Sequence, residues 1–317
     1  MSKQFFVFIN LYFLFRKQSI LPKKYSNEIG NEAAYNGQQE VIEWISKQSD
    51  VIKDWSSGLT VFSVSGGQLN LLIWLIDKKY YYDETRCCLE AIDKGHLNLL
   101  QQLLINHDFK RNKLEVQFYE RAAKRGHLHI LKWLCDKSGF RNSDSIINSA
   151  AKYGHQHIIE WLLENGVLWS SKTMYAAVKK GQLDLLEWAY NERSLNTSDR
   201  KICKKAVKHG QLEVLKWVKS QNCVWDEEIF SEAVKSENIE IMEWMKDNNC
   251  PWDKNVYFPA IKMKNIEIIK WLKDNGCPWN ESVCEEAVKH KNLDALIWLR
   301  DNGFLEFSVI ILSLGKV

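Results

Sequence analysis

The sequence is poor in residues that interrupt helices. Its 317 residues include only four prolines and fifteen glycines, and alternating runs of β-branched residues are nearly absent. Proline and glycine break helices, and alternation of apolar with polar residues is the pattern of strands. This shortage predicts an all-α fold.

A strong charge of one sign and a long apolar run are also missing. The net charge is +3, so the composition gives no overall attraction to nucleic acid or membrane. The most apolar stretch, Phe5–Phe15, is shorter than the roughly 20 residues of a membrane span. Arg16 and Lys17 follow it where a signal peptide would carry small residues. We therefore expect no membrane span, no secretion and an intracellular location.

Motifs that carry chemistry are absent as well. There is no nucleophile elbow, phosphate loop, HExxH or paired-carboxylate motif, and no CxxC pair. We expect no catalytic residue, no cofactor and no metal site, and hence a protein that is not an enzyme.

Two histidine pairs have a spacing that resembles a metal site: His127 with His129, and His155 with His157. Residues two apart on a helix point to different faces, which argues against chelation. The first histidine of each pair occupies a position that is glutamine or asparagine in other repeats. We expect it to bond the backbone of the turn.

Three of the eight cysteines, Cys223, Cys250 and Cys277, recur every 27 residues. Equivalent atoms in stacked repeats lie about 10 Å apart, which exceeds the roughly 7 Å between α-carbons that a disulfide allows. These residues are expected to be buried thiols in a reducing compartment.

What the chain has in abundance is tryptophan at a regular interval. Trp217, Trp244, Trp271 and Trp298 are each 27 positions apart, and earlier steps run from 27 to 31, with Gln102 in one position. Such a period indicates an array of small stacked units. We expect these side chains to form the core between repeats; the full set is Trp44, Trp74, Trp133, Trp161, Trp188, Trp217, Trp244, Trp271 and Trp298.

The unit that ends near Trp244 shows the expected local structure. Asp226 can cap a first helix, Ser236–Asn238 interrupts it, and a second helix follows from Ile239. Apolar residues cover more than half of the second helix, so we expect it to be sandwiched between other helices. Each unit therefore reads as helix, tight turn, helix, turn.

The sequence from Ala122 to Leu134, AAKRGHLHILKWL, resembles the helical half of an ankyrin repeat. The period of 27–29 is shorter than the usual 33, and the Thr-Pro-Leu-His opening is missing. The resemblance implies an all-α solenoid of stacked helix-turn-helix repeats with shortened hairpin turns, which binds a protein partner. The Cys-Pro-Trp turn and the regular tryptophan resemble short ankyrin repeats abundant in giant DNA viruses of amoebae, which implies a viral protein in the host cytoplasm.

The repeat register also assigns the two ends of the chain. Residues 26–303 hold ten repeats, 1–25 form an N-terminal half-repeat, and 304–317 form a C-terminal half-repeat. In the three last repeats the turn glycine is replaced by Glu237, Lys264 and Lys291, and we expect those turns to adjust. Both ends are apolar, so they are either caps or a surface for self-association.

Charge varies between repeats and suggests where a partner binds. Residues 172–208, the basic band, hold nine basic and four acidic residues. Residues 226–253, the acidic band, hold two basic and nine acidic residues. The basic band could hold a protein partner, bind nucleic acid, or pair with the acidic band. Adaptor function for a ubiquitin ligase is a further possibility for the protein. The candidate partner-binding residues are Lys179, Lys180, Lys204, Lys205 and Lys208.

Overall fold

The computed structural model describes residues 23–47, 52–81, 83–105, 116–139, 144–193 and 200–303. Within these residues there are twenty α-helices, one short 3-10 helix and no strand, as the composition predicts. The chain divides into two compact units, Met1–Leu168 and Trp169–Val317. Residues 1–22 of the expected N-terminal half-repeat (1–25) and the whole expected C-terminal half-repeat (304–317) lie outside the described residues.

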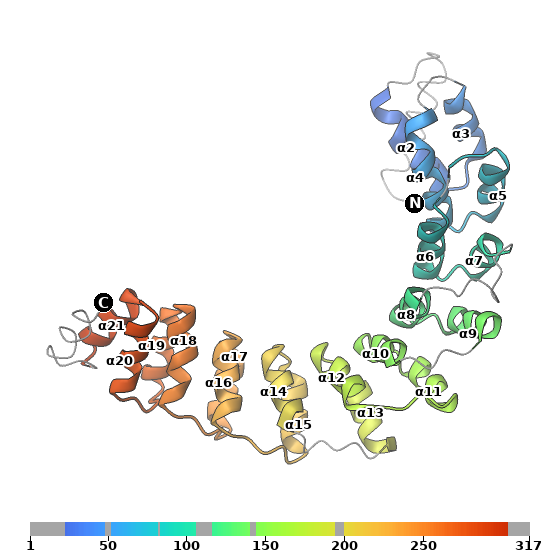
Figure 1. Cartoon of the computed structure of the whole chain (residues 1–317). Helices are drawn as coiled ribbons and strands as arrows, with labels where there is room; N and C mark the ends of the chain where they lie inside the picture. The colour runs from blue at the N-terminus through green and yellow to red at the C-terminus, as the bar shows by residue number, and fades with distance from the viewer. Residues whose placement is uncertain are drawn as a thin grey trace. The chain divides into compact units, whose positions relative to one another are not determined.

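Unit 1 contains five pairs of helices. They are α2 (Lys23–Tyr35) and α3 (Gln39–Ser46), α4 (Ile52–Ser65) and α5 (Leu69–Asp77), α6 (Glu84–Lys94) and α7 (Leu97–Leu103), α8 (Val116–Arg125) and α9 (Leu128–Ser138), and α10 (Asp144–Lys152) and α11 (Gln156–Glu164). The first helices of successive pairs pack side by side (Figure 1). Helix α2 begins three residues before the expected start of the repeats.

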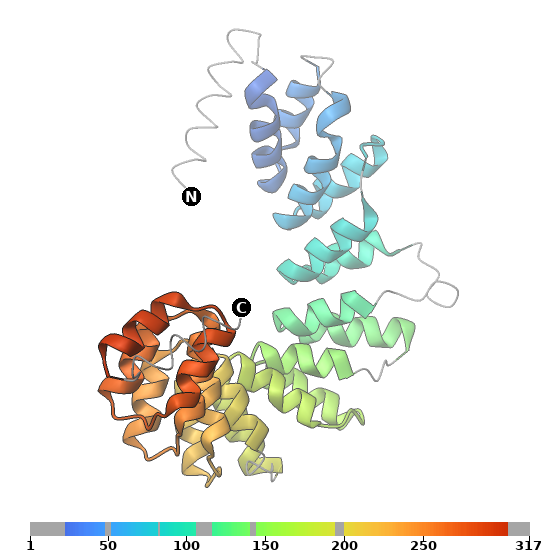
Figure 2. The ribbon, with the colours of Figure 1, turned by 60° about the vertical axis from the view of Figure 1, so that its left-hand side comes forward.

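Unit 2 contains five more pairs. They are α12 (Ser171–Lys179) and α13 (Leu183–Arg193), α14 (Arg200–Lys208) and α15 (Leu212–Ser220), α16 (Glu227–Lys235) and α17 (Ile239–Asp247), α18 (Tyr257–Met263) and α19 (Ile266–Asp274), and α20 (Glu281–Lys289) and α21 (Leu293–Asp301), with η1 (Lys254–Val256) before α18. Helices α12, α14, α16, α18 and α20 form one layer in chain order, which Figure 2 shows from a second direction.

The ends of the helices follow from their sequence. Asp226 precedes α16, and its carboxylate accepts a hydrogen bond of 3.1 Å from the backbone amide of Ile229, as expected for an N-cap. Asn238 caps α17 through the amide of Ile241. Asn249, with a φ of 58°, ends that repeat in the left-handed conformation.

The turn between the helices of a repeat keeps one conformation whether or not it contains glycine. Gly181 and Gly210 have φ values of 70° and 71°, and Glu237, Lys264 and Lys291 have values of 55°, 59° and 50°. The expected adjustment of the last three turns is therefore wrong. A side chain in this left-handed region costs about 1 kcal/mol relative to glycine, and the stacked repeats hold the turn in place.

The second helices are buried on one side only. In α17, Ile241, Met242 and Met245 are fully buried, whereas Ile239 is 41% exposed. The expectation that these helices are sandwiched is wrong, because their outer face has no helix to cover it among the described residues. All nine tryptophans of the 27-residue series are half-buried, and aliphatic neighbours occupy the fully buried positions.

The cysteines differ in part from expectation. Cys250 and Cys277 are free and buried, as predicted. Cys223 is instead paired with Cys203 in a disulfide whose α-carbons are 7.0 Å apart. The sequence argument compared cysteines one repeat apart and overlooked Cys203, which lies on the first helix of the repeat that Cys223 ends.

Candidate partner-binding surface

The five candidate lysines lie on two first helices that pack against each other. Lys179 is the last residue of α12 and Lys180 follows it, while Lys204, Lys205 and Lys208 lie on α14. Because α12 and α14 are neighbours in the same layer, their C-terminal ends carry basic residues in adjacent repeats. A positive charge at the end of a helix also favours its dipole, so local stability alone could account for part of this pattern.

The histidine after α14 lies close enough to these lysines to respond to their charge. Burial lowers the pKa of His209, and the positive charges of Lys179, Lys205, Lys208 and Lys180 lower it further. Four of the five candidate lysines therefore lie near enough to act on the pKa of one imidazole. The structure brings them together as a cluster, which we call the lysine cluster: Lys179, Lys180, Lys205 and Lys208.

A polar contact between adjacent turns holds the lysine cluster in place. The side-chain amide of Gln211 donates hydrogen bonds to the carbonyl oxygens of Lys179, at 3.3 Å, and His209, at 3.2 Å. Lys205 places its ammonium 4.9 Å from the centroid of the Tyr175 ring, a cation–π distance. Lys179, Lys180 and Lys208 are exposed, and within the described residues they form no ion pair.

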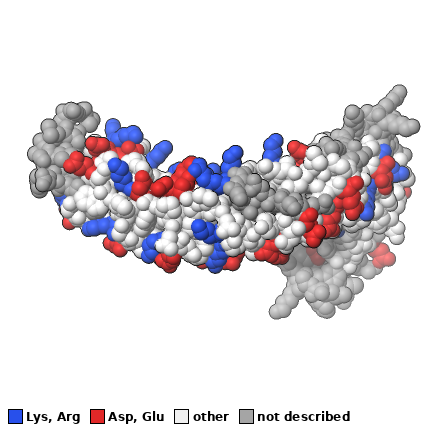
Figure 3. Space-filling model, turned by 90° about the horizontal axis from the view of Figure 1, so that it is seen from below, with Lys and Arg blue, Asp and Glu red and all other residues white. Residues whose placement is uncertain are grey.

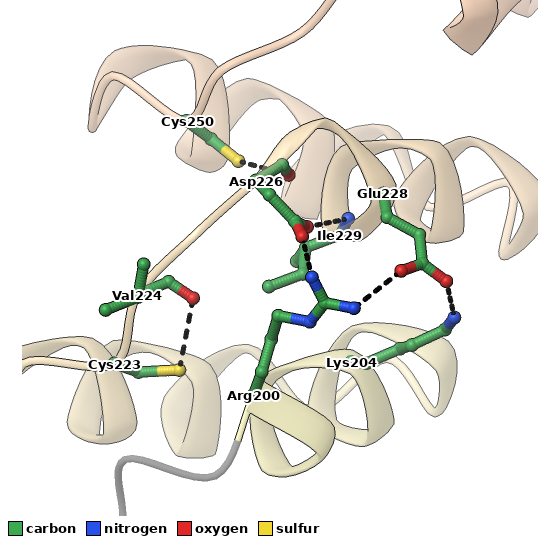
Figure 4. Close-up of polar contacts among 8 residues, drawn as sticks. All are labelled: Arg200, Lys204, Cys223, Val224, Asp226, Glu228, Ile229 and Cys250. Atoms are coloured by element: carbon green, nitrogen blue, oxygen red, sulfur yellow. Dashed lines mark hydrogen bonds and ion pairs between the residues drawn. The ribbon is translucent and has the colours of Figure 1, made fainter.

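Lys204 differs from the other four, because it belongs to an ion-pair network between repeats. Its ammonium contacts Glu228, and Arg200 contacts both Asp226 and Glu228 (Figure 4). The hydrogen bond and charge of Lys204, with the charge of Arg200, lower the pKa of Glu228. At this point the basic band pairs with the acidic band, so Lys204 is less available to a partner than the sequence suggested.

Other charges on the surface are mixed. On the face drawn in Figure 3, basic and acidic side chains are interspersed over the described residues, with no large area of one sign. The lysine cluster is thus a local feature. Ammonium groups of this kind bind anionic groups as point charges.

His127 and His129 form hydrogen bonds with backbone carbonyl oxygens, and their rings lie closer together than expected. The rings of His127 and His129 are 5.7 Å apart. His127 precedes α9 as its N-cap, so helical spacing does not separate the two. Their Nε2 atoms lie 3.4 Å from the carbonyl oxygen of Asp93 and 3.1 Å from that of Gly95. The prediction that the first histidine of the pair forms a hydrogen bond with the backbone of a turn is confirmed. Among the described residues, no three candidate metal ligands cluster.

Sequence reasoning overlooked two sets of contacts. In unit 1, Asp93 accepts hydrogen bonds from Arg121, at 2.9 Å, and Arg125, at 3.0 Å, a pairing that no periodic pattern revealed. In unit 2, Trp225 and Trp252 pack edge-on against tryptophans 19 residues later, with centroid distances of 5.5 and 6.0 Å. The recurrence of Trp225, Trp252 and Trp279 every 27 residues was the available signal.

The described helices include none that is long and apolar enough to cross a membrane.

Comparison with known proteins agrees with this architecture. No curated protein matches the chain. A family model described as ankyrin repeats (3 copies) matches residues 88–173, which run from α6 into α12. That segment carries ankyrin repeats, and the helix pairs of the described chain are consistent with an ankyrin-repeat solenoid throughout.

Proposed function

We propose that this protein is a non-catalytic scaffold that binds a protein partner through the repeat surface of unit 2. Ankyrin repeats generally mediate protein–protein interaction, and a family model of this repeat matches residues 88–173. The observation that carries the proposal is the lysine cluster, in which Lys179, Lys180 and Lys208 are exposed and form no ion pair within the described residues. Exposed charges on a rigid surface steer and select a partner of opposite charge.

The nucleic-acid alternative has weaker support. Lys204 and Arg200 are engaged by Glu228 and Asp226, so the acidic band lies directly beside the basic one and would repel phosphates. A ubiquitin-ligase adaptor remains a hypothesis with no structural observation in its favour. An intracellular location rests on the N-terminal sequence pattern and on the expected buried thiols, and a viral source rests on the resemblance to short ankyrin repeats.

The test compares the wild-type chain with the variant K179E/K180E/K208E. Lys204 is left intact because its reversal would break the ion pairs with Glu228. We expect unchanged helicity by circular dichroism and loss of partner capture from nuclease-treated lysate. The loss should be greatest at low salt, because salt screens exposed charges.

The matched control reverses three lysines in unit 1. Lys78, Lys79 and Lys94 are exposed, and Lys94, like Lys180, directly precedes a turn glycine. K78E/K79E/K94E changes the net charge by the same amount and should leave capture intact. Equal capture by the wild type and K179E/K180E/K208E would contradict the proposal.

A further inference from the structure

The inter-helix turns of unit 2 carry exposed lysines well beyond the lysine cluster. Lys262 and Lys264 lie at the end of α18, and Lys291 lies after α20. All three are exposed and form no ion pair within the described residues. With Lys179, Lys180 and Lys208 they form a row along the turns, which we call the turn row.

Only the middle turn, after α16, interrupts the turn row. There Lys235 contacts Glu232 at 3.4 Å; Lys289 makes the equivalent contact with Glu286 after α20, but that turn also carries the exposed Lys291. The glycine position is occupied by Glu237, which accepts a hydrogen bond of 2.7 Å from Asn265. Four of the five turns of unit 2, those after α12, α14, α18 and α20, are therefore basic. The middle turn, after α16, is acidic or neutral.

Two lysines of the turn row occupy positions where glycine would be less strained. Lys264 and Lys291 have φ values of 59° and 50°, in the left-handed region that Gly181 and Gly210 occupy in the same unit. A side chain in this region carries a conformational cost relative to glycine and is held there by the surrounding structure. The feature that these two residues add, relative to glycine, is an exposed positive charge.

We propose that the turn row binds an extended acidic segment of the partner, with one carboxylate opposite each basic turn and none opposite the turn after α16. Packed helices lie about 10 Å apart, and an extended chain in the polyproline II conformation advances about 3.1 Å per residue with three residues per turn, so every third side chain lies on the same face. Carboxylates every third residue therefore match successive turns. This inference rests on the proposed function and adds the chemical class of the partner.

A nucleic acid fits the turn row less well than a peptide does. Duplex DNA carries a phosphate charge about every 1.7 Å of its axis, so phosphates would necessarily face Glu237 and Glu232. A peptide can place an uncharged residue at that point. The acidic interruption thus selects a segment with spaced charges.

The test is fluorescence anisotropy of the full chain with a labelled peptide. The peptide carries aspartate at every third position and serine in the middle position, opposite the turn after α16. A second peptide has the same composition with its aspartates adjacent, and a single-stranded oligonucleotide is the third probe. We expect the spaced peptide to bind most tightly; equal or tighter binding of either other probe would overturn the proposal.

Variants at the glycine position separate charge from backbone strain. K264G/K291G removes two charges and relieves the left-handed side chains, so we expect thermal stability that is no lower and a roughly three- to tenfold weaker peptide affinity. K79G is the matched control, because Lys79 is exposed with a φ of 60° in unit 1. It should leave the affinity unchanged, and an unchanged affinity for K264G/K291G would overturn the proposal.

A gain of binding gives an independent check. The probe is a peptide with a fifth aspartate in the middle position. We expect E237K to bind this peptide more tightly than the wild type does. No difference between the two proteins would contradict the inference. If no acidic peptide binds but K179E/K180E/K208E still loses its partner, this inference fails while the proposed function stands.

Discussion

His155 in the loop before α11 lies with its Nε2 2.9 Å from the carbonyl oxygen of Lys124 in the preceding repeat. A carbonyl oxygen only accepts, so Nε2 carries the proton of this hydrogen bond. Beneath the ring lies Gly126, where an added Cβ would come within 2.9 Å of the imidazole. The side chain of His155 thus forms a hydrogen bond between its own repeat and the preceding one. Gly126, which has no side chain, leaves room for the imidazole ring.

Removal of this contact should weaken unit 1. We expect His155→Ala to lower stability by about 1 kcal/mol, the usual net value of one hydrogen bond. His155→Gln should retain most of it, because Gln211 makes the same contact with Lys179 at 3.3 Å. The check is the urea midpoint by circular dichroism, and a loss for His155→Gln equal to that for His155→Ala would contradict the assignment.

The sequence predicts the repeats well because the signals are local. The tryptophan period counts units, the caps Asp226 and Asn238 mark where helices begin, and the glycines mark the turns. Each of these depends on neighbours within one repeat. The helix boundaries in the structure follow from them closely.

The contacts between repeats were harder to predict, because they depend on how neighbouring units stack. The pairing of Lys204 with Glu228 spans 24 residues, and that of Asp93 with Arg121 spans 28. Neither has a periodic signature. The half-buried state of Trp244 was overlooked for a related reason: apolar periodicity does not tell which face of a helix lacks a neighbour.

The pairing of Asp93 makes part of the stability of unit 1 depend on pH. Burial alone would raise the pKa of Asp93, but hydrogen bonds from Arg125 and Arg121 outweigh it and lower the pKa below its ordinary value. Its side chain is 9% exposed. Because the pKa of Asp93 is lower in the folded state, its ionised carboxylate stabilises the fold at pH values above the unfolded-state pKa of about 3.9. This stabilisation is lost as the pH falls through the folded-state pKa.

We therefore expect Asp93→Asn to lower the free energy of unfolding by about 1 to 2 kcal/mol at pH 7, because the hydrogen bonds of Asp93 with Arg121 and Arg125 join charged groups. The difference from wild type should begin to shrink below about pH 4, where the carboxylate of the unfolded chain takes up its proton, and should vanish once the pH falls below the lowered pKa of the folded state. Denaturation midpoints across this pH range measure it. Asp136→Asn, at an exposed position on α9, serves as the control, and a pH-independent difference for Asp93→Asn would refute the role of the charge.

Trp225 and Trp244, which pack against each other, should differ in their effect on the stability of unit 2. Trp225 is 8% exposed, and the Lys219 ammonium lies 4.0 Å from its ring centroid. Its partner Trp244 is half-buried. We expect Trp225→Ala to cost about 3 to 5 kcal/mol, in the range for a buried aromatic residue, and Trp244→Ala to cost less. Thermal unfolding of the two variants measures which substitution costs more, and a larger loss for Trp244→Ala would show that Trp244 contributes more to the core than Trp225 does.

The buried cysteines should resist alkylation until the protein unfolds. Burial raises the pKa of both Cys250 and Cys277 to about 12. The thiolate is the reactive form, and at pH 8 a thiol with this pKa is ionised in about one molecule in ten thousand. Native protein treated with iodoacetamide should therefore show little label at either residue.

The same labelling in guanidinium chloride is the control, because unfolding returns each pKa to its ordinary value of about 8.5 and removes the steric shield. Mass spectrometry of the labelled peptides locates each site. Cys203 and Cys223 should take up label only after reduction, since they are paired. Rapid labelling of Cys250 or Cys277 in the native protein would mean that the repeat around it opens under native conditions, because a thiol that is protonated and enclosed cannot react at the rate of a free one.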